Sequence, residues 1–283
     1  MYWFRSVCLA ILIFVVASGT QLYHDSKLTK NIINSPLFVK PPVKCDKKLP
    51  GNVWLVSYAN GDVHLSNQQY LTASALNKCI DFYKPYNKQH LDPSYSQKHI
   101  KILSQKRGAG YWLWKPYVIL KTLEEIPEND VVLYVDSGGR IEKPVDHLIN
   151  QLATYDILVF ESDWNNRRYV KKDLLQMMKL DNDETRNALH LQASFIVIKN
   201  TQFSRNFIKN WLSWCENEKA LTDIPSAEEY PDFFDHRHDQ AILTLLTIKY
   251  PTNIGVLSSQ EAKKYFFLHR RLDINDNLLL FSK

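Results

Sequence analysis

Three short segments of the sequence contain residue types that could bind a metal ion, a phosphate or a sugar. One of them, Asp136-Ser137-Gly138-Gly139, directly follows the apolar run 131–135. If that run is a strand of an open parallel sheet, Asp136 lies at the carboxyl edge, where such sheets bind ligands. A carboxylate there could hold a divalent cation whose other ligands are diphosphate oxygens. An ordinary Asx turn after a strand is the alternative.

The second segment, KRGAGYWLWKP at 106–116, stands where Pro116 opens a helical pattern. Helix N-termini favour phosphates, and Arg107 and Lys115 would add positive charge. The helix dipole disfavours a cation at Lys115, a conflict that a bound anion would resolve. Trp112 and Trp114 could stack on a base or a sugar ring. Alternatively, both tryptophans are core residues and Lys115 is solvated.

Glycine is scarce, with 8 residues in the 283-residue chain, where average usage would give roughly 20. Four of the eight, Gly108, Gly110, Gly138 and Gly139, fall in these two segments. Glycine permits sharp turns and close approach of a ligand to the backbone. We therefore expect the four glycines to frame two phosphate-facing loops.

The third segment is His236-Arg237-His238-Asp239-Gln240, followed by the helical run AILTLLTIKY. The two histidines could bind a metal, although the further ligands of a hydrolytic zinc motif are missing. Asp239 suits a helix cap, and an Asp-Gln pair at a helix start could instead face a sugar.

Three further polar sites accompany predicted strands. Glu161-Ser162-Asp163 follows the run ILVF, and Gln192-Ala193-Ser194 precedes the run FIVI, so both could reach the same sheet edge or be ordinary loop residues. His269 follows a late apolar run, where a partly buried histidine is the ordinary interpretation.

The expected elements alternate between strand and helix. Continuous apolar runs at 53–59, 131–135, 157–160 and 195–198 predict buried parallel strands. Helical spacing predicts helices over 68–83, 116–126 and 203–215. This alternation predicts an α/β domain with a parallel sheet between two helical layers.

Charge and the N-terminus narrow the class of protein. Lys and Arg exceed Asp and Glu by 35 to 30, and the excess of +5 is spread along the chain, which argues against a nucleic-acid partner. Residues 1–19 combine Arg5 with an apolar run, which is typical of a signal peptide or a signal anchor. Residues 20–50, rich in Lys and Pro, predict a stem, and 51–283 the folded domain.

The cysteines predict no disulfide framework. Cys8 lies in the N-terminal run, which leaves Cys45, Cys79 and Cys215. One disulfide among these three is possible, and two buried thiols with a stem cysteine is the alternative.

Taken together, GAGYWLWKPYVILKTL, VVLYVDSGG, LQASFIVIKNT and HDQAILTLL resemble a family of glycosyltransferases with the GT-A fold, over Val53 to His269. The resemblance implies a nucleotide-diphospho-sugar transferase with a mostly parallel sheet flanked by helices. It implies Mn²⁺ or Mg²⁺ as cofactor, a nucleotide sugar as donor, and a glycan or glycoprotein as acceptor. With the N-terminal run, it implies the lumen of the Golgi or secretory pathway, with a type II membrane anchor or as a secreted chain.

The resemblance also implies roles for individual residues. Asp136 stands where the family's Asp-X-Asp metal motif begins, but Gly138 replaces the second Asp. His269 is similar in position to a late metal-ligating histidine. Asp239 and Gln240 are similar to an Asp-Gln element near the transferred sugar, and Asp163 is a further candidate base. The implied donor-binding residues are Arg107, Gly108, Gly110, Trp112, Trp114, Lys115, Ser137 and Gly138. A catalytically inactive sugar-binding protein on the same fold is the alternative.

Overall fold

The computed structural model describes residues 45–269, so the expected N-terminal signal and most of the expected stem lie outside it. The strands are β1 (Val53–Ala59), β2 (Phe82–Asn87), β3 (Val131–Val135), β4 (Gly139–Ile141), β5 (Ile157–Asn165), β6 (Leu189–Lys199), β7 (Ile254–Leu257) and β8 (Phe266–Leu268). The helices up to β5 are α3 (Asp62–Ser74), the 3-10 turn η2 (Lys88–His90), α4 (Pro93–Lys98), α5 (Ile100–Leu103), α6 (Gly108–Tyr111), α7 (Trp114–Glu125) and α8 (Asp146–Gln151). The later helices are α9 (Asn166–Tyr169), α10 (Lys172–Met177), α11 (Asp183–Asn187), α12 (Gln202–Cys215), α13 (Glu218–Leu221), α14 (His238–Lys249) and α15 (Ser259–Tyr265).

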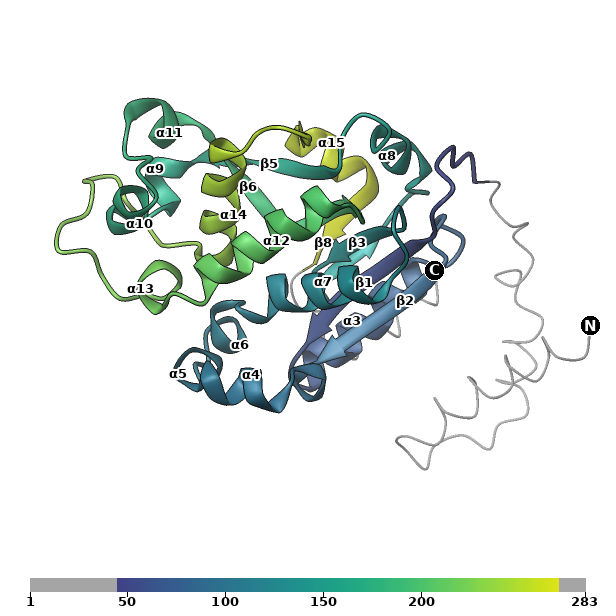
Figure 1. Cartoon of the computed structure of the whole chain (residues 1–283), viewed down its shortest axis with the longest axis horizontal. Helices are drawn as coiled ribbons and strands as arrows, with labels where there is room; N and C mark the ends of the chain where they lie inside the picture. Colours follow the sequence, from purple (N-terminus) through teal and green to yellow (C-terminus); the bar gives the residue numbers. More distant parts are fainter. Residues whose placement is uncertain (1–44, 270–283) are drawn as a thin grey trace, which may run out of the picture. The chain divides into compact units, whose positions relative to one another are not determined.

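Within the described residues, six strands form one sheet in the order β2-β1-β3-β6-β5-β7, and β4 pairs with β8 in a small second sheet (Figure 1). Strands β1, β2 and β3 are parallel, as are β5 and β7. Strand β6 runs antiparallel to both β3 and β5. The predicted α/β fold, with a mostly parallel sheet between helices, is therefore confirmed.

The expectation that the FIVI run is a parallel strand is wrong. FIVI belongs to β6, which lies between β3 and β5 and runs opposite to both. A continuous apolar run shows that both faces of a strand are covered. The run carries no information about direction, which depends on how the chain returns to the sheet.

The apolar residues of the central strands divide between two cores, because successive side chains of a strand point to opposite faces. Val132 and Tyr134 of β3 pack into one core, together with α7, α12 and α14. Val131, Leu133 and Val135 pack into the other core, which also takes in α3, α8 and α15. Burial on both faces holds β3 rigidly, so the turn that follows it has a fixed position.

The predicted helix over 68–83 is wrong at its C-terminal half. Helix α3 ends at Ser74, and the chain then turns through Asn77 and Cys79, both with positive φ, before β2 begins at Phe82. Leu71, Ala75 and Cys79 are all buried in the same core, as the spacing suggested. The helical spacing therefore identified the buried residues, although Cys79 is held by a turn and a disulfide. The helices predicted over 116–126 and 203–215 are confirmed as α7 and α12.

Cys45 and Cys79 form a disulfide, and Cys215 is a buried free thiol. The start of the described chain is also bound to the domain, since Asp46 N donates to Asp146 Oδ2 at 3.0 Å and Lys48 N donates to Asn150 Oδ1 at 2.8 Å. The last residues of the expected stem are thus attached to the domain. Over residues 45–269, no helix has the length and apolar character that crossing a membrane requires.

We predict that Cys79→Ala lowers the free energy of unfolding by about 2–4 kcal/mol, because the cross-link restricts the unfolded chain. Urea unfolding of the wild type and the variant measures the difference. Cys45→Ala should lose the contribution of the same bond, and Cys79→Ala should lose slightly more, because it also removes a buried side chain from the core. A wild-type chain whose unfolding is unaffected by a reducing agent would contradict the disulfide.

Candidate functional site

A cleft of about 1000 Å³ opens at the edge of the sheet where β1 and β3 end. It is lined by the end of β1, by the segment from Arg107 to Trp114, and by the turn after β3. Seven of the thirteen residues to which the resemblance gives a role line it: Arg107, Gly108, Trp112, Trp114, Asp136, Ser137 and Gly138. The fold thus brings the first two polar segments of the sequence to one cavity.

Asp136 lines this cleft and is held in place by Tyr134 and Lys115. Tyr134 Oη donates to Asp136 Oδ1 at 2.6 Å, and Lys115 Nζ lies 3.3 Å from the same oxygen. The backbone N of Asp136 donates to Ser194 O at 2.9 Å. Burial raises the pKa of the Tyr134 hydroxyl well above its usual value, so this group stays a proton donor. The carboxylate is therefore fixed in place while 28% of the side chain remains exposed.

Lys115, which the resemblance implied as a donor-binding residue, does not line the cleft. Its side chain is 3% exposed, and Nζ lies 3.0 Å from Asp239 Oδ2 and 3.3 Å from Asp136 Oδ1. Nζ also donates to Ala193 O at 3.1 Å. Burial alone would lower the pKa of Lys115, but the two carboxylates outweigh it and the pKa is raised. The conflict between this cation and the helix dipole is thus resolved by two carboxylates and not by a bound anion.

Asp239 is the buried member of this cluster and does not cap helix α14. The helix N-cap is Arg237, and the Asp239 carboxylate, 4% exposed, points to Lys115. Burial raises the pKa of Asp239 to about 6, although Lys115 opposes the shift. Trp211 Nε1 donates to the Asp239 backbone O at 2.9 Å, which fixes the start of the helix against α12.

The part of the cleft wall formed by Gly108 to Trp112 is a left-handed turn. All five residues from Gly108 to Trp112 have positive φ, and each non-glycine residue in this conformation costs about 1–2 kcal/mol. A Cβ at Gly108 would lie 2.3 Å from the Trp112 ring, and one at Gly110 would lie 2.7 Å from Leu103 Cα. At these two positions the backbone conformation and the close contacts both require glycine, and a role of the loop in binding phosphate stays a prediction.

Contacts of two tryptophans stabilise this turn. Trp112 stacks on the His238 ring, with centroids 5.4 Å apart. Trp114 Nε1 donates to Gly108 O at 2.9 Å, and its ring stacks on Tyr58 at 4.0 Å. Trp114 is 6% exposed and belongs to the core, although its edge lines the cleft. The core alternative is therefore confirmed for Trp114, and stacking of either ring on a base or a sugar stays a prediction.

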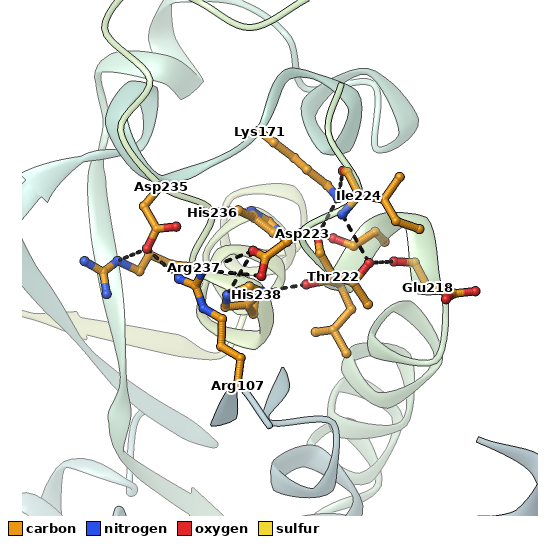
Figure 2. Close-up of polar contacts among 12 residues, drawn as sticks. Arg107, Lys171, Glu218, Thr222, Asp223, Ile224, Asp235, His236, Arg237 and His238 are labelled. Carbon is orange, nitrogen blue, oxygen red and sulfur yellow. Dashed lines mark hydrogen bonds and ion pairs between the residues drawn. The ribbon is translucent and has the colours of Figure 1, made fainter. Parts of the chain in front are cut away.

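Arg107 connects the cleft to residues 222–237, the irregular segment between α13 and α14 (Figure 2). Its Nη1 lies 3.2 Å from Asp223 Oδ1, and its Nη2 lies 2.7 Å from Asp235 Oδ2. The same segment is tied down by buried Lys171, whose Nζ donates to Thr222 O at 2.8 Å and Ile224 O at 3.1 Å. Arg107 is therefore an ion-paired residue of the cleft wall.

His236 and His238 are structural in this fold. His236 Nε2 lies 3.0 Å from Ala220 O, and His238 Nδ1 lies 2.8 Å from Leu221 O. Burial lowers the pKa of both rings, to about 4 for His238, so both are neutral at pH 7. Within residues 45–269, no group of three or more His, Cys, Asp and Glu side chains is placed to hold a metal ion.

The remaining candidates lie outside the cleft lining. Ser259 Oγ donates to Asp163 Oδ1 at 2.5 Å and Lys263 Nζ lies 3.2 Å from Oδ2, so Asp163 is tied to α15. Gln240 is half-buried in the first turn of α14. His269 N donates to Gly138 O at 3.0 Å, and both of its ring nitrogens are buried without a hydrogen-bond partner.

Sequence reasoning missed Tyr134, Asp223 and Asp235. Tyr134 carried a usable signal, because it is the one hydroxyl in the apolar run VVLYV and lies on the same face of the strand as Asp136. Asp223 and Asp235 carried none, since acidic residues in a long polar segment are ordinarily solvated.

No protein-family model and no curated protein sequence matches the chain. Among solved structures, it is similar to mouse xyloside xylosyltransferase 1, at 9% identity over 73% of this chain and 84% of that chain, with a TM-score of 0.41. It is similar to the galactosyltransferase LgtC in complex with donor and acceptor sugar analogues, at 14% identity over 71% and 72% of the two chains, with a TM-score of 0.42. A glycosyltransferase involved in glycosylation of the major capsid of PBCV-1 is similar at 9% identity over 80% and 98%, with a TM-score of 0.44.

We predict that Lys115→Met lowers the free energy of unfolding at pH 7.5 by about 3–5 kcal/mol, because it leaves buried Asp239 without its counter-charge. The loss should shrink at pH 5. At pH 5 the folded variant keeps a proton on Asp239, because the pKa of this group is about 6 already in the wild type, against 3.8 for an ordinary Asp. A group with a raised pKa in the folded state stabilises the fold as the pH falls, so the variant regains stability.

The matched control is Lys121→Met on the same helix, which removes ion pairs to Asp92 and Glu125 at 3.5 and 3.8 Å. Exposed pairs of this kind contribute about 0–1 kcal/mol. Urea unfolding at both pH values compares the two variants. Equal losses of unfolding free energy in the two variants would contradict the conclusion that Lys115 compensates buried Asp239.

We predict that Gly108→Ala displaces the Trp112 ring, since the added Cβ would lie 2.3 Å from it. The tryptophan fluorescence spectrum should shift, and ligand binding in the cleft should weaken at least tenfold. Gly61→Ala is the control, because Gly61 also has positive φ, +89°, but nothing lies within 4 Å of its added Cβ. The same spectral shift in both variants would attribute the effect to backbone strain alone.

Proposed function

We propose that this chain is a GT-A type glycosyltransferase, which moves a sugar from a nucleoside-diphosphate donor to a hydroxyl of a glycan or glycoprotein. The observation that carries the proposal is the convergence of two segments on one cleft. The Asp136 turn and the Gly108 to Trp114 segment, far apart in the sequence, both line it at the carboxyl edge of parallel strands. This is the edge where open α/β sheets bind nucleotides.

We propose that a divalent cation binds at Asp136, with the donor supplying part of its coordination shell. Asp136 offers one carboxylate in the cleft, and His269 offers ring nitrogens without hydrogen-bond partners beside Gly138. Mg²⁺ is commonly held by one or two carboxylates together with substrate phosphates. Asp136 and His269 would hold Mn²⁺ or Mg²⁺, which when bound would offset the negative charge of the leaving diphosphate.

Side chains of this protein hold the Asp136 carboxylate in a fixed orientation. Tyr134 and Lys115 hold Asp136 at Oδ1, so the carboxylate does not reorganise when a donor arrives. Asp239 acts through Lys115 as a positioning residue, because its carboxylate is buried behind the cleft. Gln240 begins the same helix and is proposed to lie near the transferred sugar. Asp163, bound to Ser259 and Lys263, has no part in the proposed machinery.

The two loops would bind the donor by different means. Ser137 and Gly138 would let the diphosphate approach the backbone after β3, and Trp112 would contact the base or the sugar ring across the cleft. Arg107 keeps 40% of its side chain exposed despite two ion pairs, so part of its guanidinium is accessible to a donor phosphate from the cleft.

We place the enzyme in the lumen of the Golgi or secretory pathway, as a type II membrane protein or a secreted chain. Two observations support this compartment: the apolar run in residues 1–19 and the Cys45–Cys79 disulfide. Disulfides persist in oxidising compartments. The mass of the mature chain distinguishes an anchored chain from a cleaved one.

We predict that the purified full-length chain releases nucleoside diphosphate from at least one of a panel of nucleotide sugars in the presence of Mn²⁺. Asp136→Asn should lower kcat/KM by about 10²–10³, while its urea unfolding still shows one folded transition. Asp183→Asn is the control, because Asp183 is 81% exposed and pairs with Arg186.

Full activity of Asp136→Asn would remove Asp136 from the site. A second function, an inactive sugar-binding protein, is favoured by Gly138 in place of a second carboxylate. Calorimetry separates the two functions. Glycan binding without any metal-dependent nucleotide binding would support the second function and overturn the transferase.

A further inference from the structure

Two exposed aromatic rings contact the same buried tyrosine ring. Trp164 in β5 and Phe234 in the 222–237 segment are 48% and 66% exposed. Both meet the buried ring of Tyr169 edge-on, with centroids 5.4 and 6.2 Å away and interplanar angles of 73° and 78°. We call Trp164, Tyr169 and Phe234 the aromatic platform. Large apolar side chains exposed together mark binding surfaces more often than singly exposed ones do.

Backbone hydrogen bonds hold the aromatic platform in place. Phe234 N donates to Arg168 O at 2.9 Å, and Arg237 N donates to Tyr169 O at 3.0 Å. The 222–237 segment is therefore fastened to α9 on both sides of Asp235. Because the rings are already positioned, little conformational entropy is lost when a ligand stacks on them.

Arginines surround the aromatic platform. Arg168 Cζ lies 5.7 Å from the Phe234 ring, and Arg237 Cζ lies 4.9 Å from the Tyr169 ring. Arg167 is paired with Asp232 at 3.3 Å. Arg168 is exposed and forms no ion pair with any carboxylate of residues 45–269. Its guanidinium is thus available to an anionic group of a ligand.

The aromatic platform adjoins the cleft through one ion pair. Arg107, which lines the cleft, pairs with Asp235 at 2.7 Å (Figure 2). Asp235 follows Phe234 directly in the sequence. Strand β5, which carries Trp164, is also parallel to β3 in direction, so both strands end at the same sheet edge. A ligand on the platform would therefore sit beside the proposed donor site.

We propose that the aromatic platform binds the acceptor, and that this acceptor is an acidic saccharide carrying a carboxylate or a sulfate. The apolar face of a pyranose would stack on Trp164 and Phe234. Arg168 would pair with the anionic group, since a guanidinium binds carboxylate and sulfate oxygens in a planar, two-pronged geometry. This inference rests on the proposed transferase function and specifies its acceptor.

The test is calorimetric binding to the full-length chain of two tetrasaccharides that differ in charge: hyaluronan tetrasaccharide, which carries uronates, and neutral chitotetraose. The acidic sugar should bind the wild type at least tenfold more tightly. Trp164→Ala and Phe234→Ala should each weaken both sugars at least tenfold. Arg168→Gln should remove the preference, bringing the acidic sugar to the affinity of the neutral one.

Matched controls lie away from the platform. Phe82→Ala removes another exposed aromatic ring, 44% exposed on β2, and Lys209→Gln removes an exposed charge on α12. Both should leave saccharide binding unchanged. Equal wild-type affinity for the two sugars, no binding of either, or a platform that binds anionic phospholipid vesicles in place of saccharides would each overturn the proposal.

Donor hydrolysis distinguishes this proposal from the one it rests on. Trp164→Ala and Phe234→Ala should keep wild-type release of nucleoside diphosphate to water, because the platform does not line the donor cleft. Loss of saccharide binding with normal donor hydrolysis supports the platform as the acceptor site. Absence of donor hydrolysis in the wild type, with saccharide binding intact, refutes the transferase and leaves the platform as a glycan-binding surface.

Discussion

The buried ammonium of Lys115 is the interaction on which the rest of the site depends. It lies within 3.3 Å of carboxylate oxygens of both Asp136 and Asp239, and it donates to the Ala193 carbonyl. Removing one charge from such a cluster is expensive, because the others lose their compensation in a poorly solvated interior. The contacts join α7, the end of β3, β6 and the start of α14. Four segments that are separate in sequence are thereby held together next to the cleft.

Local strain in front of this cluster is compensated by packing. The left-handed turn from Gly108 to Trp112 is unfavourable at its three non-glycine residues. It is held by the stacking of Trp112 on His238 and by the bond from Trp114 to Gly108. Gly139, after Asp136, serves a different need, since a Cβ there would lie 2.6 Å from Val135 Cγ1. Scarce glycine thus provides both left-handed backbone and close approach in the first loop, and close approach alone at Gly139 in the second.

The 222–237 segment connects the two halves of the proposed reaction. It supplies Asp223 and Asp235 to Arg107 at the cleft wall, and it supplies Phe234 to the aromatic platform. Its own fold depends on buried Lys171 and on hydrogen bonds to α9, because it contains no helix or strand. A long irregular segment with this many anchors can keep a fixed geometry between a donor site and an acceptor surface.

The sequence by itself determined the α/β class, the strands that form the centre of the sheet, and the location of the two loops that line the cleft. These follow from local properties: apolar continuity, helical spacing, and glycine where few glycines exist. The direction of β6, the end of α3 at Ser74 and the burial of Lys115 were decided by the tertiary structure. Each depends on partners distant in the chain. From the sequence alone, Lys115 at the start of a helix is interpreted as a phosphate ligand. The fold places two carboxylates beside it instead, and the energy of a charge depends on its surroundings in space.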